Sequence, residues 1–509
     1  MTKNSRTQKS LKNVSSSLLT YFFNIILQFL NRTIFLMYLS VDYLGINGLF
    51  LNIISMLNLA ELGIAGAMIY ALYKPLADKD TEQIKSLMLL YKRLYTGVGI
   101  FVLGIGFLIT PFLNYFISVE SSNIAYLHYY FILYVLDTGI SYFLSYKRSI
   151  IICDQKQYIV NRTSMIRIIL TNILQIIILI TTQNYALYLI VKIICTFLEN
   201  LLITKIANER YPYLKEKASM PHTQEVKKIS KNIIAMSMHK IGTVVVFSTD
   251  NLIITKFVSL SATGIYSNYT LIVNALTNIM AQLFQSVTAS VGNLIANDDN
   301  KEHIYDVFKN IFFMNYILYL VISIGLYYSV NSFITLWIGK KYILNELTVF
   351  CIALSFFSLG MRKTIMMFKD ADGLFWNDRY KPLLEAFCNL LFSIPLAMHY
   401  GIAGTLIGTI ITNIFIAGSI EAYVTYKYLF KRKIWEYYFI QLKYYVILVF
   451  LIIILNNLSF HIGNSIVEFF LKGIFSILIS LFVIIVTFRK KSEYQYIKSI
   501  FFDFFNKNR

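Results

Sequence analysis

The chain has 509 residues, of which 57% are hydrophobic and only 14% are charged, and its mean hydropathy is +0.60. A soluble protein of this length has polar surfaces, whereas these apolar residues form continuous blocks of about 20 residues, the length that crosses a bilayer. The net charge of +19 would fit nucleic-acid binding, but the basic residues lie between the blocks, where the positive-inside rule places them. Because the blocks do not alternate, they exclude a β-barrel and predict an all-α integral membrane protein.

About fourteen transmembrane helices are predicted. In chain order they are expected at residues 16–38, 45–70, 94–117, 124–146, 163–181, 184–205, 233–256, 263–296, 310–331, 345–367, 381–399, 401–427, 440–458 and 465–488. The odd-numbered loops contain only Lys256, Lys340 and Lys341 as basic residues. Nearly all other Lys and Arg lie in or beside the two tails and the even-numbered loops, which predicts that both termini are cytoplasmic.

An internal repeat divides the chain into two halves of equal orientation. Gly45 and Gly264 lie in similar loops after spans 1 and 7, at an offset of 219 residues. Further matches are residues 76–80 with 295–299 at the same offset and, more loosely, residues 147–148 with 362–363. Such repeats predict two pseudo-symmetric six-helix lobes around a central cavity. The expected parts are an N-terminal lobe (1–208), a cytoplasmic linker (209–232), a C-terminal lobe (233–430), accessory spans 13 and 14 (431–488) and an amphipathic surface tail (489–509).

Polar residues gather on one face of span 1 and on the matching face of span 7. The face of span 1 carries Ser17, Tyr21, Asn24, Gln28, Asn31 and Arg32, and that of span 7 carries His239, Lys240, Thr243 and Asp250. The repeat offset sends Asn24 to Thr243 and Asn31 to Asp250, so the two helices are expected to line opposite walls of the cavity.

Other spans add polar residues, for which a structural role is an alternative. Span 5 carries Thr163, Arg167, Thr171 and Gln175 at every fourth position, span 6 carries Lys192 and Glu199, and spans 2 and 4 carry Glu61 and Asp137. Small polar residues often join helices. Lys192 would also fit snorkelling, and Arg167 would fit the cytoplasmic headgroups. Glu468 and Lys472, four residues apart, are predicted to form an ion pair with each other.

The sequence lacks several common catalytic, nucleotide-binding and metal-binding motifs. It contains no phosphate-binding loop, His-Glu-x-x-His motif, Cys-x-x-Cys motif or nucleophile elbow. The four cysteines are dispersed without disulfide or metal spacing. We therefore expect neither an enzyme nor a cofactor or metal.

A set of short motifs runs through the chain in a consistent order. In the first half they are RTIF (32–35), YLGINGLF (43–50), ELGI (61–64) and IYALYKPLA (69–77). In the second half they are HKIG (239–242), TDNLII (249–254), GIYSNY (264–269), GLF (373–375), YKPLLEA (380–386) and YGIAGTLIGT (400–409). This set resembles the Wzx-type polysaccharide repeat-unit flippases of the multidrug/oligosaccharidyl-lipid/polysaccharide exporter superfamily.

The resemblance implies a function in the bacterial cell (inner) membrane. The family flips undecaprenyl-diphosphate-linked oligosaccharide from the cytoplasmic to the outer leaflet by alternating access, for capsule, exopolysaccharide or O-antigen synthesis. Polysaccharide polymerase and glycosyltransferases are implied partners. Arg32 and Lys240 stand in matching motifs as contacts for the anionic substrate, whereas Arg167 and Lys192 rest on their positions alone.

These considerations predict two groups of site residues. The expected substrate-binding residues are Arg32, Lys240, Arg167, Lys192, Asn24, Gln28, Asn31 and Thr243. The expected ion-coupling residues are Asp250, Asp137, Glu61 and Glu199, with protons, sodium and the membrane potential as alternative driving forces. Two other functions remain as alternatives: a related exporter of small cationic compounds, and a membrane-embedded polysaccharide transferase or polymerase.

Overall fold

The computed structural model describes residues 3–61, 63–117, 126–154, 156–298, 300–458 and 465–507, and these residues are almost entirely helical. They fall into two compact units, Met1–Gly264 and Ile265–Arg509. Unit 1 contains α1 (Lys3–Tyr38), α2 (Val41–Leu57), α3 (Ile64–Asp78), α4 (Thr81–Ile109), α5 (Leu127–Ser145), α6 (Lys147–Cys153), α7 (Gln157–Thr182), α8 (Tyr185–Arg210) and α9 (Thr223–Phe257). Helix α10 (Leu260–Asn297) begins at the end of unit 1 and continues into unit 2.

Unit 2 holds the remaining helices. They are α11 (Lys301–Trp337), α12 (Glu346–Ala371), α13 (Lys381–Ile411), α14 (Gly418–Val424), α15 (Trp435–Asn457), α16 (Ser465–Phe488) and α17 (Ser492–Lys507). As far as the structure describes it, each predicted span lies mostly on helix, and the predicted all-α membrane-protein fold is confirmed. Within the described residues, nine helical segments are long and apolar enough to cross a membrane. One of them, Lys381–Phe430, contains two predicted spans.

Asparagine and aspartate begin several of these helices. The Asp80 side chain accepts the Gln83 backbone N–H at the start of α4, and Asn345 accepts the N–H of Thr348 at the start of α12. Asn184 accepts two N–H groups at the start of α8. Such side chains satisfy backbone donors that have no partner inside the helix. The short polar connections between spans therefore also set where the next helix begins.

Two predicted spans deviate from straight helices. The span expected at 45–70 is two helices, because a 3₁₀ turn at Asn58–Glu61 and a left-handed Gly63 (φ 93°) separate α2 from α3. Within α13 the chain reverses at Gly401, whose φ of 61° and ψ of −134° are readily adopted only by glycine. This residue lies at the boundary predicted between spans 11 and 12.

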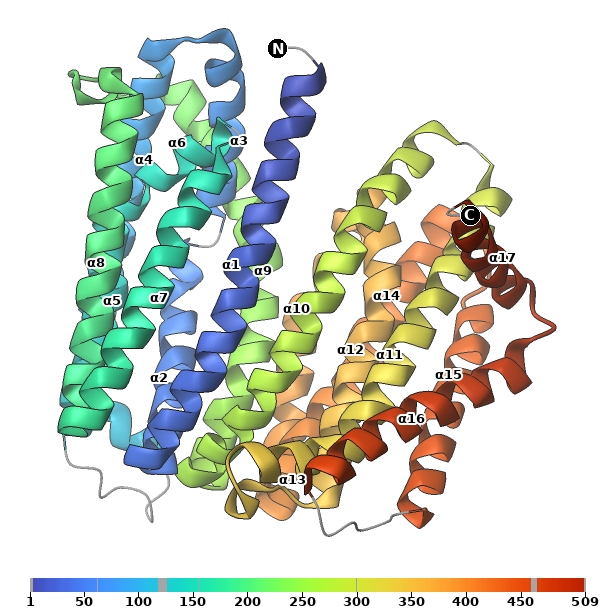
Figure 1. Cartoon of the computed structure of the whole chain (residues 1–509). Coiled ribbons are helices and arrows are strands. Elements are labelled where there is room, and N and C mark those ends of the chain that lie inside the picture. The colour runs from blue at the N-terminus through green and yellow to red at the C-terminus, as the bar shows by residue number, and fades with distance from the viewer. Residues whose placement is uncertain are drawn as a thin grey trace. The chain divides into compact units, whose positions relative to one another are not determined.

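In unit 1, α1 packs along α7, while α8 packs against both α5 and α7 (Figure 1). Helix α9 packs against α2 and α3. The first turns of α2 and α10 contact each other reciprocally: a Cβ added at Gly45 would overlap the Leu260 carbonyl, and one at Gly264 would overlap the Val41 carbonyl. Since Val41 and Gly45 match Leu260 and Gly264 in the repeat, the two glycines allow the same close backbone approach from each side.

Aromatic side chains form the core of unit 2, where α11 packs against α12, α15 and α16. Tyr316 and Tyr444 are stacked with ring centroids 3.7 Å apart, and Phe488 contacts both. The predicted Glu468–Lys472 pair is confirmed, with the Nζ and Oε1 atoms 2.7 Å apart. The predicted amphipathic tail is helical as α17, which packs against α11.

Candidate functional site

A buried network of amides and a phenol joins α1, α7 and α8 in unit 1. The Asn31 side-chain amide donates to Asn172 Oδ1 (2.9 Å) and Gln175 Oε1 (3.1 Å), and its carbonyl accepts from the Tyr188 hydroxyl (2.9 Å). Gln175 in turn donates to the Tyr188 backbone carbonyl. The polar faces predicted on spans 1 and 5 thus meet each other, and Asn31 and Gln175 fasten helices together.

The remaining polar residues of the α1 face lie on either side of this network. Gln28 donates to Asn24 Oδ1 at 3.2 Å, so these two predicted substrate contacts also bond to each other. The Arg32 guanidinium interacts electrostatically with the phenols of Tyr188 and Tyr134. Arg32 therefore lies in the part of unit 1 where tyrosines of α5 and α8 gather.

A small recess between α5 and α8 brings together two predicted site residues. Lys192 Nζ lies 3.1 Å from Asp137 Oδ2 and 5.1 Å from the centre of the Tyr134 ring. The recess is lined by Leu133, Tyr134, Asp137, Leu189, Lys192 and Ile193. Asp137 Oδ1 has no hydrogen-bond partner among the described residues. Lys192 therefore faces a carboxylate instead of snorkelling outward, and the pair is neutral overall.

Glu61 is held by phenols. The Tyr95 hydroxyl donates to Glu61 Oε1 (2.5 Å), and the Tyr142 hydroxyl donates to Oε2 (2.8 Å). No cation lies within ion-pair distance of this carboxylate among the side chains that the structure describes. Among the described residues, the predicted ion-coupling residue Glu61 is thus held by hydrogen bonds and not by an ion pair.

Glu199 of α8 is buried and binds two arginines. Its carboxylate lies 2.6 Å from Arg167 Nε of α7 and 3.1 Å from Arg148 Nη2 at the start of α6. Ser164 donates a third contact at 2.6 Å. Arg167 and Glu199, predicted for different roles, therefore form one cluster, and Arg148 is a member that the sequence analysis did not include among the site residues.

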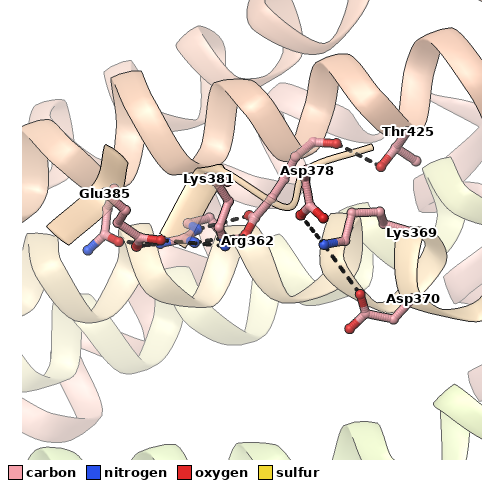
Figure 2. Close-up of polar contacts among 9 residues, drawn as sticks. Arg362, Lys369, Asp370, Asp378, Lys381, Glu385 and Thr425 are labelled. Atoms are coloured by element: carbon pink, nitrogen blue, oxygen red, sulfur yellow. Dashed lines mark hydrogen bonds and ion pairs between the residues drawn. The ribbon is translucent and has the colours of Figure 1, made fainter. Parts of the chain in front are cut away.

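Unit 2 contains a second buried ionic cluster, none of whose members was predicted as a site residue (Figure 2). Arg362 of α12 donates to both oxygens of Glu421 (3.0 and 2.8 Å) and to Glu385 Oε1 (2.9 Å). Lys381 Nζ lies 2.6 Å from the same Glu421, and Arg362 also donates to Asn413. The buried Lys369, in the last turn of α12, pairs with Asp378 in the connection between α12 and α13.

Helix geometry places Glu421 in this cluster. It lies on α14, between two π-helical segments at Thr412–Ala417 and Thr425–Phe430. π-Helical turns widen the helix and are frequent at functional sites. The sequence signals that pointed here were the charged residues 362–363 at the end of span 10 and the four-residue spacing of Lys381 and Glu385.

Other predicted site residues lie on α9. The Lys240 and Thr243 side chains are outside the described part of the chain, so their predicted roles stay predictions. Asp250 is half-buried near the end of the same helix. The described residues contain no group of three or more His, Cys, Asp or Glu that would hold a metal ion.

Comparisons with known proteins identify the fold. No family model and no curated protein matches the sequence. The solved structure of the lipid II flippase MurJ in an inward closed conformation matches with a TM-score of 0.65 and 17% identity, covering 93% of this chain and 99% of MurJ. An inward-facing multidrug resistance MATE family transporter of the MOP superfamily matches at 0.59 and 13%, covering 82% of this chain and 97% of the transporter.

A third match is a point mutant of the Vibrio cholerae MATE transporter VcmN, with a TM-score of 0.57, 15% identity, and coverage of 85% of this chain and 99% of VcmN. All three cover nearly their whole length, so the likeness extends over the complete transporter fold and not over a shared helical hairpin. The chain therefore has the multi-pass membrane fold common to MATE transporters and the lipid II flippase MurJ.

Proposed function

We propose that this protein is a flippase that moves undecaprenyl-diphosphate-linked oligosaccharide repeat units from the cytoplasmic to the outer leaflet of the bacterial cell membrane. The Wzx-type motifs of the sequence and the fold shared with a lipid II flippase support this proposal. In it, two lobes alternate in access around the substrate, both termini are cytoplasmic, and the product feeds a polysaccharide polymerase.

The observation that carries the choice of cargo is the charge balance at two intramembrane carboxylates, Asp137 and Glu199. A carrier of cationic compounds needs acidic groups free to bind its cargo. In unit 1, however, Asp137 is paired with Lys192, and Glu199 is shared by Arg148 and Arg167. The basic side chains match or exceed the acidic ones at both places, which favours an anionic cargo such as a diphosphate.

Glu61 is the ion-coupling residue that we favour. Among the described residues Glu61 contacts phenols and no cation, so it can take up a proton without breaking an ion pair. Protonation of Asp137 or Glu199 would instead leave a cation without its partner. In this proposal Glu61 takes up and releases the proton that accompanies the conformational cycle.

A deletion strain tests the function directly. Loss of the gene should leave lipid-linked oligosaccharide on the inner leaflet and remove the surface polysaccharide, and the wild-type gene should restore it. Drug-efflux assays with the purified protein address the exporter alternative. Incubation with lipid-linked repeat units addresses the polymerase alternative, because a polymerase would lengthen them. Normal polysaccharide in the deletion strain would refute the proposal.

A further inference from the structure

The ionic clusters of the two units occupy equivalent places in the repeat. An offset of 214 residues, one less than that of the looser match of residues 147–148 with 362–363, aligns polar positions near the end of the fourth span and along the fifth span of each half. It pairs Arg148 with Arg362, Arg167 with Lys381, Thr171 with Glu385, and Gln175 with Asn389. In each half the arginine also pairs with a glutamate of the sixth span, Glu199 or Glu421. The two clusters therefore have equivalent residues in the repeat. They differ in net charge and in exposure, and these differences indicate the role of each cluster.

The cluster of unit 2 is electrically neutral and closed. It contains two cations, Arg362 and Lys381, and two carboxylates, Glu385 and Glu421. Each of these side chains is at most 10% exposed. With its charges matched and its side chains covered, this cluster ties three helices together and lacks the excess charge that would hold a further ion, although Asn413 Nδ2 has no hydrogen-bond partner among the described residues.

The cluster of unit 1 has one positive charge in excess. Arg148 and Arg167 share the single carboxylate Glu199, because Thr171 stands where unit 2 has its second carboxylate, Glu385. The side chains of the two arginines are also more open, at 32% and 27% exposed. The unit 1 cluster therefore has both the charge and the access that an anion requires.

Unused hydrogen-bonding capacity supports the same reading. Thr171 is only 6% exposed, yet its hydroxyl has no hydrogen-bond partner among the described residues. The buried Nε of Arg148 likewise has no acceptor in the described part of the chain. Buried polar groups are nearly always paired in proteins, so two such groups in one cluster point to a partner that belongs there.

The surroundings of the cluster are positive as well. Next to Arg148, burial lowers the pKa of Lys147, and the nearby Lys92 and Lys215 lower it further. Lys147 donates to a neutral group, Asn208 Oδ1 (2.6 Å). Two carboxylates of unit 1, Asp154 and Glu216, are engaged by Lys156 and Lys85. The positive potential is thus not cancelled locally.

We propose that Arg148 and Arg167 form an anion site for a phosphate or diphosphate group at the end of unit 1 that the proposed topology places in the cytoplasm. Arginine is suited to this role because its planar fork of N–H donors matches phosphate oxygens. The site rests on the proposed function: it would hold the diphosphate of the lipid-linked substrate before translocation. Because the equivalent cluster in unit 2 is neutral, the two halves of the repeat would differ in how they bind the substrate.

The experiment uses a substitution that gives the unit 1 cluster the same net charge as the unit 2 cluster. Thr171→Glu supplies the missing carboxylate one helical turn from Arg167, and Thr171→Gln is a control of nearly equal size without charge. The full-length protein in nanodiscs is titrated with farnesyl diphosphate, inorganic phosphate and phosphatidylglycerol. We expect Thr171→Glu and Arg148→Gln to weaken farnesyl diphosphate binding about tenfold more than Thr171→Gln does, the size of a lost charge-assisted contact.

The three probes separate the sources of the phosphate group. Tighter binding of farnesyl diphosphate than of the other two identifies a prenyl diphosphate, and equal binding of all three overturns that assignment. Lys309→Gln, which removes a half-buried cation of unit 2 paired with Asp306, should leave binding unchanged. Equal affinity of the two Thr171 variants would overturn the site itself. Loss of binding by Thr171→Glu in a protein whose deletion leaves surface polysaccharide intact would instead retain the site and refute the proposed function.

Discussion

Replacing Glu421 by glutamine removes the central carboxylate of the unit 2 cluster and leaves Arg362 and Lys381 facing Glu385 alone. Glu421 is fully buried and accepts three hydrogen bonds from these two cations. Breaking a buried ion pair by removing one partner costs about 3–5 kcal/mol of unfolding free energy, because the other charge stays buried without compensation. We expect Glu421→Gln to destabilise the protein by that amount.

The four cysteines provide the assay. Cys153, Cys195, Cys351 and Cys388 are all buried and free. Burial raises the pKa of the Cys153 thiol to about 12, so at pH 8 it stays protonated and does not react with maleimide until it is exposed. A thiol-reactive fluorophore added during heating therefore reports unfolding, and the midpoint temperature of Glu421→Gln should lie well below that of the wild type.

Two controls distinguish loss of charge balance from loss of packing. Asp306→Asn breaks a surface pair between the exposed Asp306 and the half-buried Lys309 and should cost about 1 kcal/mol or less. The double variant Glu421→Gln with Lys381→Met restores neutrality between Arg362 and Glu385, and it should be more stable than Glu421→Gln alone. An unfolding temperature for Glu421→Gln equal to that of Asp306→Asn, or a double variant less stable than the single one, would refute the reasoning.

Three further predictions concern unit 1. Asn31→Leu leaves Gln175 and the Tyr188 hydroxyl without their partner and should lower stability by about 1–3 kcal/mol, measured by the same thiol assay; an unchanged unfolding temperature would contradict the network's role. Glu61→Gln keeps the size of the side chain and one acceptor oxygen for Tyr95 or Tyr142 but removes the carboxylate, so flipping in proteoliposomes should no longer respond to an imposed pH gradient, whereas a persisting response would exclude Glu61 as the coupling residue. Gly264→Val places a side chain against the Val41 carbonyl and should reduce transport more than Gly292→Val, because Gly292 has open space around its Cβ position; equal activity of the two would contradict the close approach.

Much of the fold was predictable from the sequence because membrane crossing imposes simple rules. A helix must satisfy its own backbone in the bilayer, so each run of about 20 apolar residues becomes a span. The predicted boundary between spans 11 and 12 coincides with Gly401, whose positive φ is readily adopted only by glycine. The pair Glu468–Lys472 was predictable because residues four apart share a helix face.

The helices, their polar faces and the repeat could thus be predicted from the sequence, because each depends on neighbours along the chain. The side-chain partners could not: Arg167 contacts Glu199, Lys192 contacts Asp137, and Arg362 contacts Glu421 only in the folded protein. These contacts join different helices, so they depend on the rotation and height of each helix against the next. Helical periodicity specifies which side of a helix is polar, but side-chain packing between helices specifies what that side touches.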